Sequence, residues 1–174
     1  MKLLAFAASS SSKSINKQLA TYAASLVPNA TVEILDINDY EMPLFSQDRE
    51  DELGQPEAAK AFYAKLGQAD AIIISFAEHN GSYTAAYKNL FDWTSRIDMK
   101  LFQNKPMVLL ATSPGPGGAK TVLAAATASA PYFAADVKAS LSIPSFFDNF
   151  DSDKQEITNL DLLDELQSAL AQLS

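Results

Sequence analysis

Serine and lysine side chains crowd one short stretch near the start of the chain, Ser9-Ser10-Ser11-Ser12-Lys13-Ser14. The stretch follows an apolar run and precedes a segment with helical spacing, so it is expected to lead a strand into a helix. A helix N-terminus presents unpaired backbone N–H groups, and the hydroxyls of Ser9, Ser11 and Ser14 would add donors. With Lys13 supplying a full charge, the chemistry suits an anion, above all a phosphate. A serine that merely caps the helix is the alternative, and the loop alone does not decide between them.

A second stretch with unusual chemistry is Ala77-Glu78-His79-Asn80-Gly81-Ser82-Tyr83. Asn80-Gly81 indicates a tight turn, and Gly81 would let the backbone approach a ligand closely. His79 is the one histidine of the chain, and Glu78 is its only evident titratable partner. A zinc site is disfavoured because there are no cysteines to complete it. We therefore interpret His79 as a residue that stacks on a ring or lines a pocket wall.

A third stretch, Thr112-Ser113-Pro114-Gly115-Pro116-Gly117-Gly118-Ala119-Lys120-Thr121, is similar at first sight to a nucleotide-binding P-loop. Pro114 and Ala119, however, stand where that motif requires glycine. A glycine-rich turn that passes close to a flat ligand fits better, and a plain strand-to-helix turn is the alternative. No G-x-G-x-x-G follows a strand and no G-x-S-x-G occurs, which argues against a Rossmann dinucleotide-binding domain and a serine hydrolase.

Apolar runs and helical periodicity alternate along the chain and predict the elements that position these stretches. Five strands are expected, at 3–8, 32–37, 71–76, 107–111 and 137–143. Five helices are expected, at 14–26, 56–66, 84–96, 118–130 and 159–173. Three of the runs are continuous rather than alternating, as in strands that are buried on both faces of a parallel sheet.

The expected fold is a single α/β domain over residues 1–174, a flavodoxin-like three-layer sandwich. Its five-stranded parallel sheet should have the order 2-1-3-4-5, with helices on both faces. Ligands bind such sheets outside the carboxyl ends of the strands, so the three stretches should meet there. The connection from Asp39 to Gly54 holds six acidic residues and little periodicity. It is expected to be a mobile rim, an interface arm or a solvated loop without a role.

Composition excludes several classes of partner. A formal net charge of -8 argues against nonspecific binding to nucleic acid or to anionic membranes. The apolar runs are far shorter than the roughly 20 residues of a membrane span, and the N-terminal run is read as a buried strand rather than a signal peptide. The absence of cysteine excludes disulfides and is compatible with the cytoplasmic location that we expect.

Together the three stretches resemble the NADPH-dependent FMN reductases, flavodoxin-like flavoenzymes that include quinone, chromate and azo-dye reductases. The resemblance covers nearly the whole chain. The family's first loop, roughly G-S-x-R-x-x-S-x-N, corresponds to 8–16. Its P-E-Y-N-G-S-x motif and the following L-K-N-x-x-D-W-x-S-R correspond to 77–83 and 87–96. Its K-P strand and S-P-G-x-x-G-G turn correspond to 105–106 and, with one residue fewer, 113–118.

The resemblance implies a role for each matched position. The FMN phosphate would be surrounded by Ser9, Ser11, Ser14, Ile15 and Asn16. The isoalloxazine ring would be lined by Glu78, His79, Asn80 and Gly81, and approached from the other side by Ser113 and Gly115. Three residues depart from the family pattern: Ser11 replaces arginine, Ala77 replaces proline and His79 replaces tyrosine.

The resemblance further implies an NAD(P)H-dependent reductase that passes hydride from NADPH or NADH to bound FMN and then reduces a second, small-molecule acceptor. The second acceptor would be a free flavin, a quinone, an azo compound or a metal oxyanion. No protein acid or base is assigned, and the backbone of Asn80 and Gly81 is expected to stabilise charge on the ring. A homodimer or homotetramer is expected. One alternative is a noncatalytic, flavodoxin-like FMN electron carrier, because the acidic surface of the chain would dock to basic partner proteins. Another is a degenerate family member that no longer binds FMN.

Overall fold

The computed structural model describes residues 1–173 and contains one five-stranded sheet whose strands are all parallel. The strand order is β2-β1-β3-β4-β5, as predicted. The three central strands are buried on both faces, which explains their continuous apolar runs. The strands are β1 (Lys2–Ala8), β2 (Thr31–Leu35), β3 (Ala71–Phe76), β4 (Pro106–Thr112) and β5 (Asp136–Ile143).

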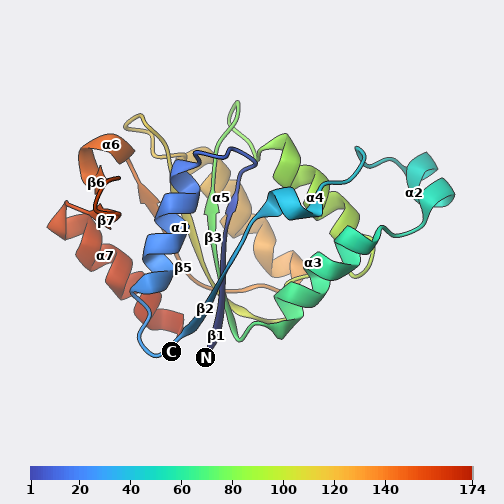
Figure 1. Ribbon diagram of the computed structural model, residues 1–174, viewed down its shortest axis with the longest axis horizontal. Helices are drawn as coiled ribbons and strands as arrows, with labels where there is room; N and C mark the ends of the chain where they lie inside the picture. Colours follow the sequence, from blue (N-terminus) through green and yellow to red (C-terminus); the bar gives the residue numbers. More distant parts are fainter. Residues whose placement is uncertain (174) are drawn as a thin grey trace.

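Helices cover both faces of the sheet and complete the predicted three layers (Figure 1). One face carries α1 (Ile15–Ser25) and α7 (Leu160–Leu170), and the other carries α3 (Glu57–Gln68), α4 (Ala85–Ser95) and α5 (Lys120–Ser129). Each face has its own apolar core. Phe6 and Phe62 meet edge to face in one, with ring centroids 5.7 Å apart, and Leu19 packs in the other.

Side-chain caps fix where three of these helices begin. Ser14, Thr84 and Asn159 each accept a hydrogen bond from a backbone N–H in the first turn of α1, α4 and α7. The predicted starts of these three helices coincide with the caps. α5 differs, because Ala119 stands at its cap position with a φ of 56° and has no side-chain oxygen to offer.

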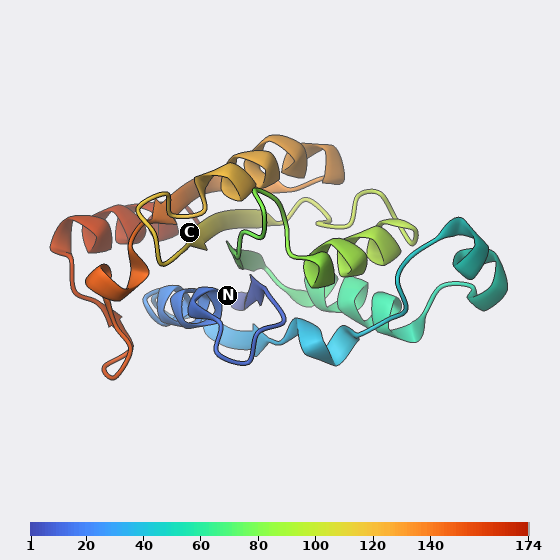
Figure 2. The same ribbon diagram turned by 90° about the horizontal axis from the view of Figure 1, so that it is seen from above.

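The acidic connection 39–54 is not featureless, which corrects the prediction. Ile37, expected in the second strand, begins a 3-10 helix, η1 (Ile37–Tyr40), and is buried there. A helix, α2 (Gln47–Leu53), is capped by Ser46 and lies far from the sheet (Figure 2). α2 has no buried residue, so the sequence carries no apolar periodicity that would reveal it.

The C-terminal third contains further short elements that the sequence pattern did not predict. They are η2 (Ala130–Phe133), α6 (Phe146–Asn149) and the hairpin of β6 (Phe150–Asp151) and β7 (Glu156–Ile157). The end of the predicted helix 159–173 is a 3-10 turn, η3 (Ala171–Leu173). Phe146 and Phe150 stack with ring centroids 4.6 Å apart and anchor this region to the core. Within residues 1–173 no helix has the length and apolar character to cross a membrane.

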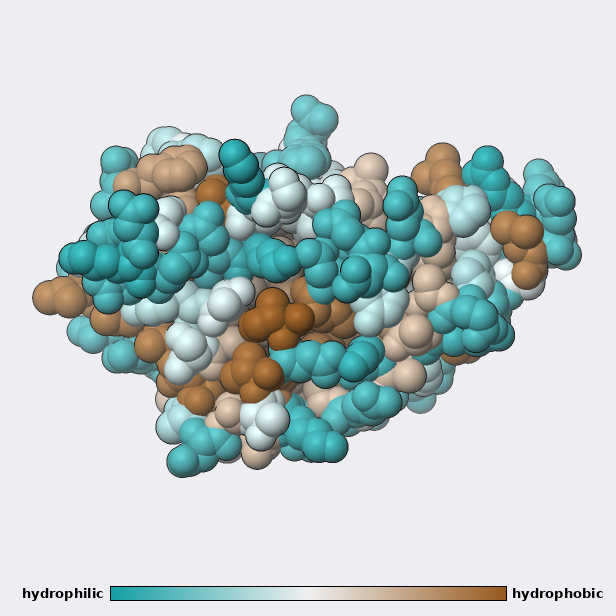
Figure 3. Space-filling view, viewed as in Figure 1, coloured by the Kyte–Doolittle hydropathy of each residue, from teal (hydrophilic) through white to brown (hydrophobic). Residues whose placement is uncertain are grey.

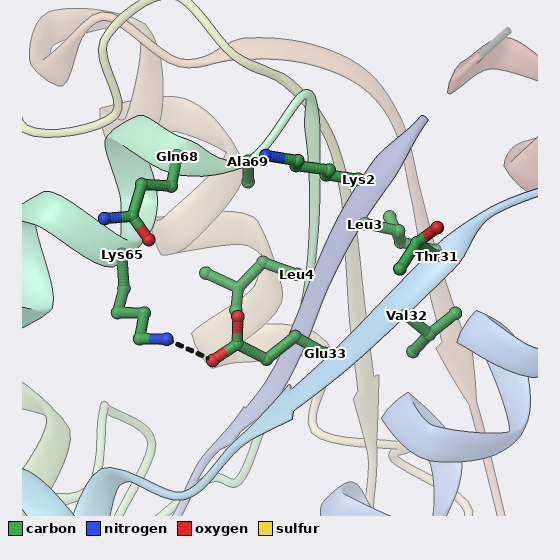
Figure 4. A pocket seen from close by; sticks show the side chains of 9 residues that line it. All are labelled: Lys2, Leu3, Leu4, Thr31, Val32, Glu33, Lys65, Gln68 and Ala69. Atoms are coloured by element: carbon green, nitrogen blue, oxygen red, sulfur yellow. Dashed lines mark hydrogen bonds and ion pairs between the residues drawn. The ribbon is translucent and has the colours of Figure 1, made fainter.

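β2 is one of the two edge strands of the sheet, and apolar side chains gather on the molecular surface beside it (Figure 3). Val32 and Ile34 are 39% and 36% exposed there. A hollow of about 250 Å³ opens beside β2 at the amino ends of the strands. The ion pair between Lys65 Nζ and Glu33 Oε1, 2.6 Å long, closes one side of it (Figure 4). We call it the amino-edge hollow.

Candidate functional site

The stretches that follow β1, β3 and β4 meet at the carboxyl edge of the sheet (Figure 2). They surround a hollow of about 270 Å³, which we call the three-loop hollow. The predicted site residues that line it are Ser9, Ser11, Ser14, Ile15, Asn16, Glu78, His79 and Ser113. It is also lined by Lys13, Ala77, Thr112 and Pro114. Asn80, Gly81 and Gly115 lie in the same loops but outside its lining.

The first loop wraps around the start of α1. The Ser14 backbone N–H donates to the Ser11 carbonyl oxygen at 3.2 Å, and the Lys17 backbone N–H donates to Ser14 Oγ at 3.1 Å. The Ser11 backbone N–H donates to Ser9 Oγ at 3.3 Å. Ser14 is therefore a helix cap, and its hydroxyl hydrogen remains available for a second partner. Capping and anion binding are compatible at this loop rather than exclusive.

Residues at the end of β2 brace the first loop from outside. Asn38 Nδ2 donates to the Ser10 carbonyl oxygen at 3.2 Å and to Asp36 Oδ1 at 2.9 Å. Lys17 Nζ, from α1, lies 2.6 Å from Asp36 Oδ2. The hydrogen bond from Lys17, and next the backbone N–H of Asn38, hold the pKa of the Asp36 carboxyl below its ordinary value. Asp36 is thus ionised at neutral pH and forms an ion pair with Lys17. Lys13 is then the lysine of the loop that can contact an anion.

Asn16 joins three elements beneath the hollow. Its side chain is buried, and Oδ1 accepts hydrogen bonds from Ser75 Oγ at 2.7 Å and from the Thr112 backbone N–H at 3.1 Å. Its Nδ2 donates to the Thr112 carbonyl oxygen at 3.1 Å. The amide thus ties α1 to the ends of β3 and β4. Its predicted contact with phosphate stays a prediction, and the backbone N–H of Asn16 in the first turn of α1 is a donor that could make it.

Asn80 and Gly81 form the tip of a two-residue hairpin, as the sequence predicts. The His79 backbone N–H donates to the Ser82 carbonyl oxygen at 3.0 Å, and the Ser82 N–H donates back to His79 at 3.1 Å. Asn80 and Gly81 have φ values of 53° and 75°, which is the geometry of a type I′ turn. Both central N–H groups lie outside the hairpin's own bonds, so the tip offers two fixed donors.

Glu78 has a contact that sequence reasoning missed. Its Oε2 accepts a hydrogen bond from the Val122 backbone N–H, in the first turn of α5, at 2.8 Å. The loop after β3 is therefore joined to the helix that follows β4. The lack of a capping oxygen at Ala119 indicates that α5 needs an acceptor from elsewhere, but the sequence does not indicate which residue supplies it.

The loop after β4 is held rigidly by its neighbours. The Ser145 backbone N–H donates to the Gly115 carbonyl oxygen at 2.9 Å, and the Phe146 N–H donates to Ser113 at 3.1 Å. Gly118 has a φ of 59°, and a Cβ there would lie 3.1 Å from the Pro144 Cα and would also collide with Ser142 Oγ. Glycine is thus required at 118 so that the loop can pack against the end of β5.

The donors around the first loop suit a phosphate monoester. The first turn of α1 offers backbone N–H groups, the serines offer hydroxyls, and Lys13 is exposed beside them. The N-terminus of α5 is not a second phosphate site, because the Glu78 carboxylate already accepts a hydrogen bond from its first turn. Among residues 1–173 no group of three or more histidine, aspartate or glutamate side chains is placed to hold a metal ion.

Comparison with known proteins identifies the family of the chain. The model of the NADPH-dependent FMN reductase family matches residues 1–148. The chain belongs to this family. The match includes all three loops of the hollow, and the family confirms the resemblance that the motifs indicated.

Characterised relatives are reductases. A 2-hydroxy-1,4-benzoquinone reductase of Burkholderia sp. is 38% identical over 104 residues, which are 59% of this chain and 55% of that protein. An NAD(P)H-dependent FMN reductase of Pseudomonas aeruginosa is 34% identical over 116 residues, 66% of this chain and 61% of that protein. The alignments therefore span a little over half the length of these relatives.

The fold also has counterparts among solved structures. A flavoenzyme NAD(P)H:(acceptor) oxidoreductase from Paracoccus denitrificans superposes with a TM-score of 0.77 and 21% identity. The alignment covers 99% of this chain and 94% of that one. At this level of identity the likeness establishes the fold, and the predicted flavodoxin-like architecture is confirmed.

Proposed function

We propose that the chain is an NAD(P)H-dependent FMN reductase, which passes reducing equivalents from NADPH or NADH to a small-molecule acceptor. The observation that carries the proposal is the three-loop hollow, where serine hydroxyls and Lys13 at the start of α1 face the loops after β3 and β4. FMN, when bound, would supply the redox chemistry by accepting a hydride and giving its electrons to a second acceptor. The relatives support a quinone or a free flavin as that acceptor.

The chain's own groups divide into a phosphate end and a ring end. At the phosphate end the FMN would be held by Ser9, Ser11, Ser14, Ile15 and Asn16, and Lys13 is the cation among the residues that line the hollow. At the ring end the candidates are Glu78, His79, Asn80, Gly81, Ser113 and Gly115. Ser11 stands where the family has arginine, so the phosphate end relies on neutral donors and on helix α1.

The backbone N–H groups at the hairpin tip would stabilise the negative charge that develops on the flavin ring. The hydrogen-bonded geometry of the hairpin fixes the N–H groups of Asn80 and Gly81 before any ligand arrives. Fixed donors stabilise negative charge that develops on a neighbouring ring without a cost in reorganisation. No side-chain acid or base is needed for hydride transfer, which agrees with a site whose single histidine is exposed.

We also propose that the chain works as a homodimer or homotetramer. A hollow of about 400 Å³ on the surface of α4 is lined mainly by apolar atoms of Tyr83, Phe91, Met99 and Phe133. Met99 is 59% exposed there. Tyr83 belongs both to this surface and to the loop after β3, so a second copy seated on it would lie beside the ring end of the site.

Anaerobic spectroscopy tests the function. Protein loaded with FMN should lose its yellow absorbance quickly when NADPH or NADH is added, and a quinone should restore it. Slow bleaching that becomes fast only with a separate reductase would instead identify an electron carrier, which the net charge of -8 suits. A protein that does not quench the fluorescence of added FMN would contradict both functions.

A further inference from the structure

We propose that Glu78 is a positioning residue, which caps α5 from the neighbouring loop and so holds the two walls of the ring site at a fixed separation. The contact is the hydrogen bond from the Val122 backbone N–H to Glu78 Oε2, 2.8 Å long. The residues that it joins are 44 positions apart in the chain. The inference rests on the proposed function, because it concerns how the flavin ring is held.

The contact reproduces a cap that the helix's own sequence lacks. In α1 the Ser14 side chain accepts from the N–H three residues further on, that of Lys17, at 3.1 Å. In α4 the Thr84 side chain accepts from Tyr87 in the same way at 3.2 Å. Val122 stands at this third position of α5, three residues after Ala119. Glu78 therefore takes the place of the missing capping side chain.

Charge strengthens this cap. A carboxylate near a helix N-terminus is stabilised by the partial positive charge of the unpaired N–H groups. Hydrogen bonds from N–H groups to an ionised carboxylate are also stronger than those to a neutral acceptor. Glu78 is half-buried at the hollow, so the contact is screened less than one on the open surface.

The position of the contact connects it to the ligand. Glu78 directly precedes His79 and the hairpin tip, which form one wall of the ring site. Val122 follows the loop 113–119, which forms the other wall. A ring held between the walls binds only when their separation is right. If the walls move independently, the competent arrangement is a fraction of the population, and the apparent Kd rises by the inverse of that fraction.

Three variants separate a positioning role from its alternatives. Glu78→Ala removes the acceptor, whereas Glu78→Gln keeps a side-chain carbonyl that accepts from Val122 without the charge. Glu57→Ala is the control with the same change in net charge, because Glu57 is exposed at the start of α3 and does not line the hollow. Circular dichroism establishes that all four proteins are folded at the temperature of the assays.

Two measurements are made on each protein. The first is hydrogen–deuterium exchange at the Val122 amide without flavin, and the second is the Kd of FMN from quenching of its fluorescence. For Glu78→Ala we expect about tenfold faster exchange and about tenfold weaker FMN binding, as suits the loss of one charge-assisted hydrogen bond. Glu78→Gln should stay within about threefold of wild type in both. Glu57→Ala should match wild type.

Several outcomes overturn the inference. Unchanged exchange in Glu78→Ala would show that the cap does not exist in solution. Fast exchange with unchanged FMN affinity would show that the cap does not position the site. Slow exchange with weak FMN binding in Glu78→Gln would mean that the carboxylate acts on the flavin directly. Wild-type protein that binds no FMN would overturn the proposed function as well, and exchange in the flavin-free protein identifies that case separately.

Discussion

One buried amide holds the floor of the three-loop hollow together. Asn16 makes three hydrogen bonds to two strands, and each of its partners is itself buried. A side chain without an amide would leave the Thr112 N–H and carbonyl and the Ser75 hydroxyl unpaired in the interior. Buried polar groups without partners are costly because they have lost their hydration.

Asn16→Ala should therefore lower the free energy of unfolding by about 2–4 kcal/mol, measured by urea denaturation. Gln18→Ala is the control in the same helix, because Gln18 makes an exposed side-chain contact with Gln155. Gln18→Ala should change stability by less than about 0.5 kcal/mol. A loss in Asn16→Ala no larger than that of the control would contradict the structural role.

The ion pair between Asp36 and Lys17 predicts how the free energy of unfolding changes with pH. The lowered pKa of Asp36 means that its ion pair with Lys17 stabilises the fold above the ordinary value of 3.8 and is lost as the pH falls through the folded-state pKa. The side chains of Lys17 and Asp36 are 40% and 34% exposed, so Asp36→Asn should lower the free energy of unfolding by less than about 1 kcal/mol at pH 7. Urea denaturation should show the difference shrink below pH 3.8. A difference that grows on acidification would contradict the assigned ion pair.

At the scale of elements, the loops after the strands are fixed by packing against neighbouring elements. Gly118 is the clearest case, since a Cβ at this residue would meet the backbone of Pro144 at 3.1 Å. Gly118→Ala should destabilise the fold by about 1–3 kcal/mol in urea denaturation, because alanine is strained at a φ of 59°. Gly117→Ala is the matched control, with open space around its Cβ, and should be tolerated. Equal effects of the two changes would refute the packing argument.

The elements also show what the sequence can and cannot reveal. The three central strands and the five large helices were predictable because each buries an apolar stripe or run, whereas β2 was predictable from its alternating apolar residues although only Leu35 is buried. The helix α2 was not, since none of its residues is buried. The Asn80-Gly81 turn was predictable from local backbone chemistry. The contact of Glu78 with Val122 was not, because a bond across 44 residues depends on the packed fold.

At the scale of the whole molecule, an apolar surface lies beside the site, formed in part by Tyr83, Phe91, Met99 and Phe133. Met99→Asp, in the segment that follows α4, should weaken self-association by at least tenfold, because it places a charge in an apolar interface. Analytical ultracentrifugation measures this. Leu160→Asp is the control, 72% exposed at the start of α7, on the opposite face of the sheet. Equal self-association of Met99→Asp and wild type would exclude this surface as the interface.

The central claim is that the three-loop hollow holds FMN, and backbone NMR of the protein titrated with FMN tests it most directly. We predict that the largest shift changes fall in 9–16, 77–83 and 113–118, and that inorganic phosphate perturbs only the first of these segments. Residues of the amino-edge hollow around Lys65 should stay unchanged. Shift changes that centre on the amino-edge hollow, or that avoid all three loops, would contradict the account.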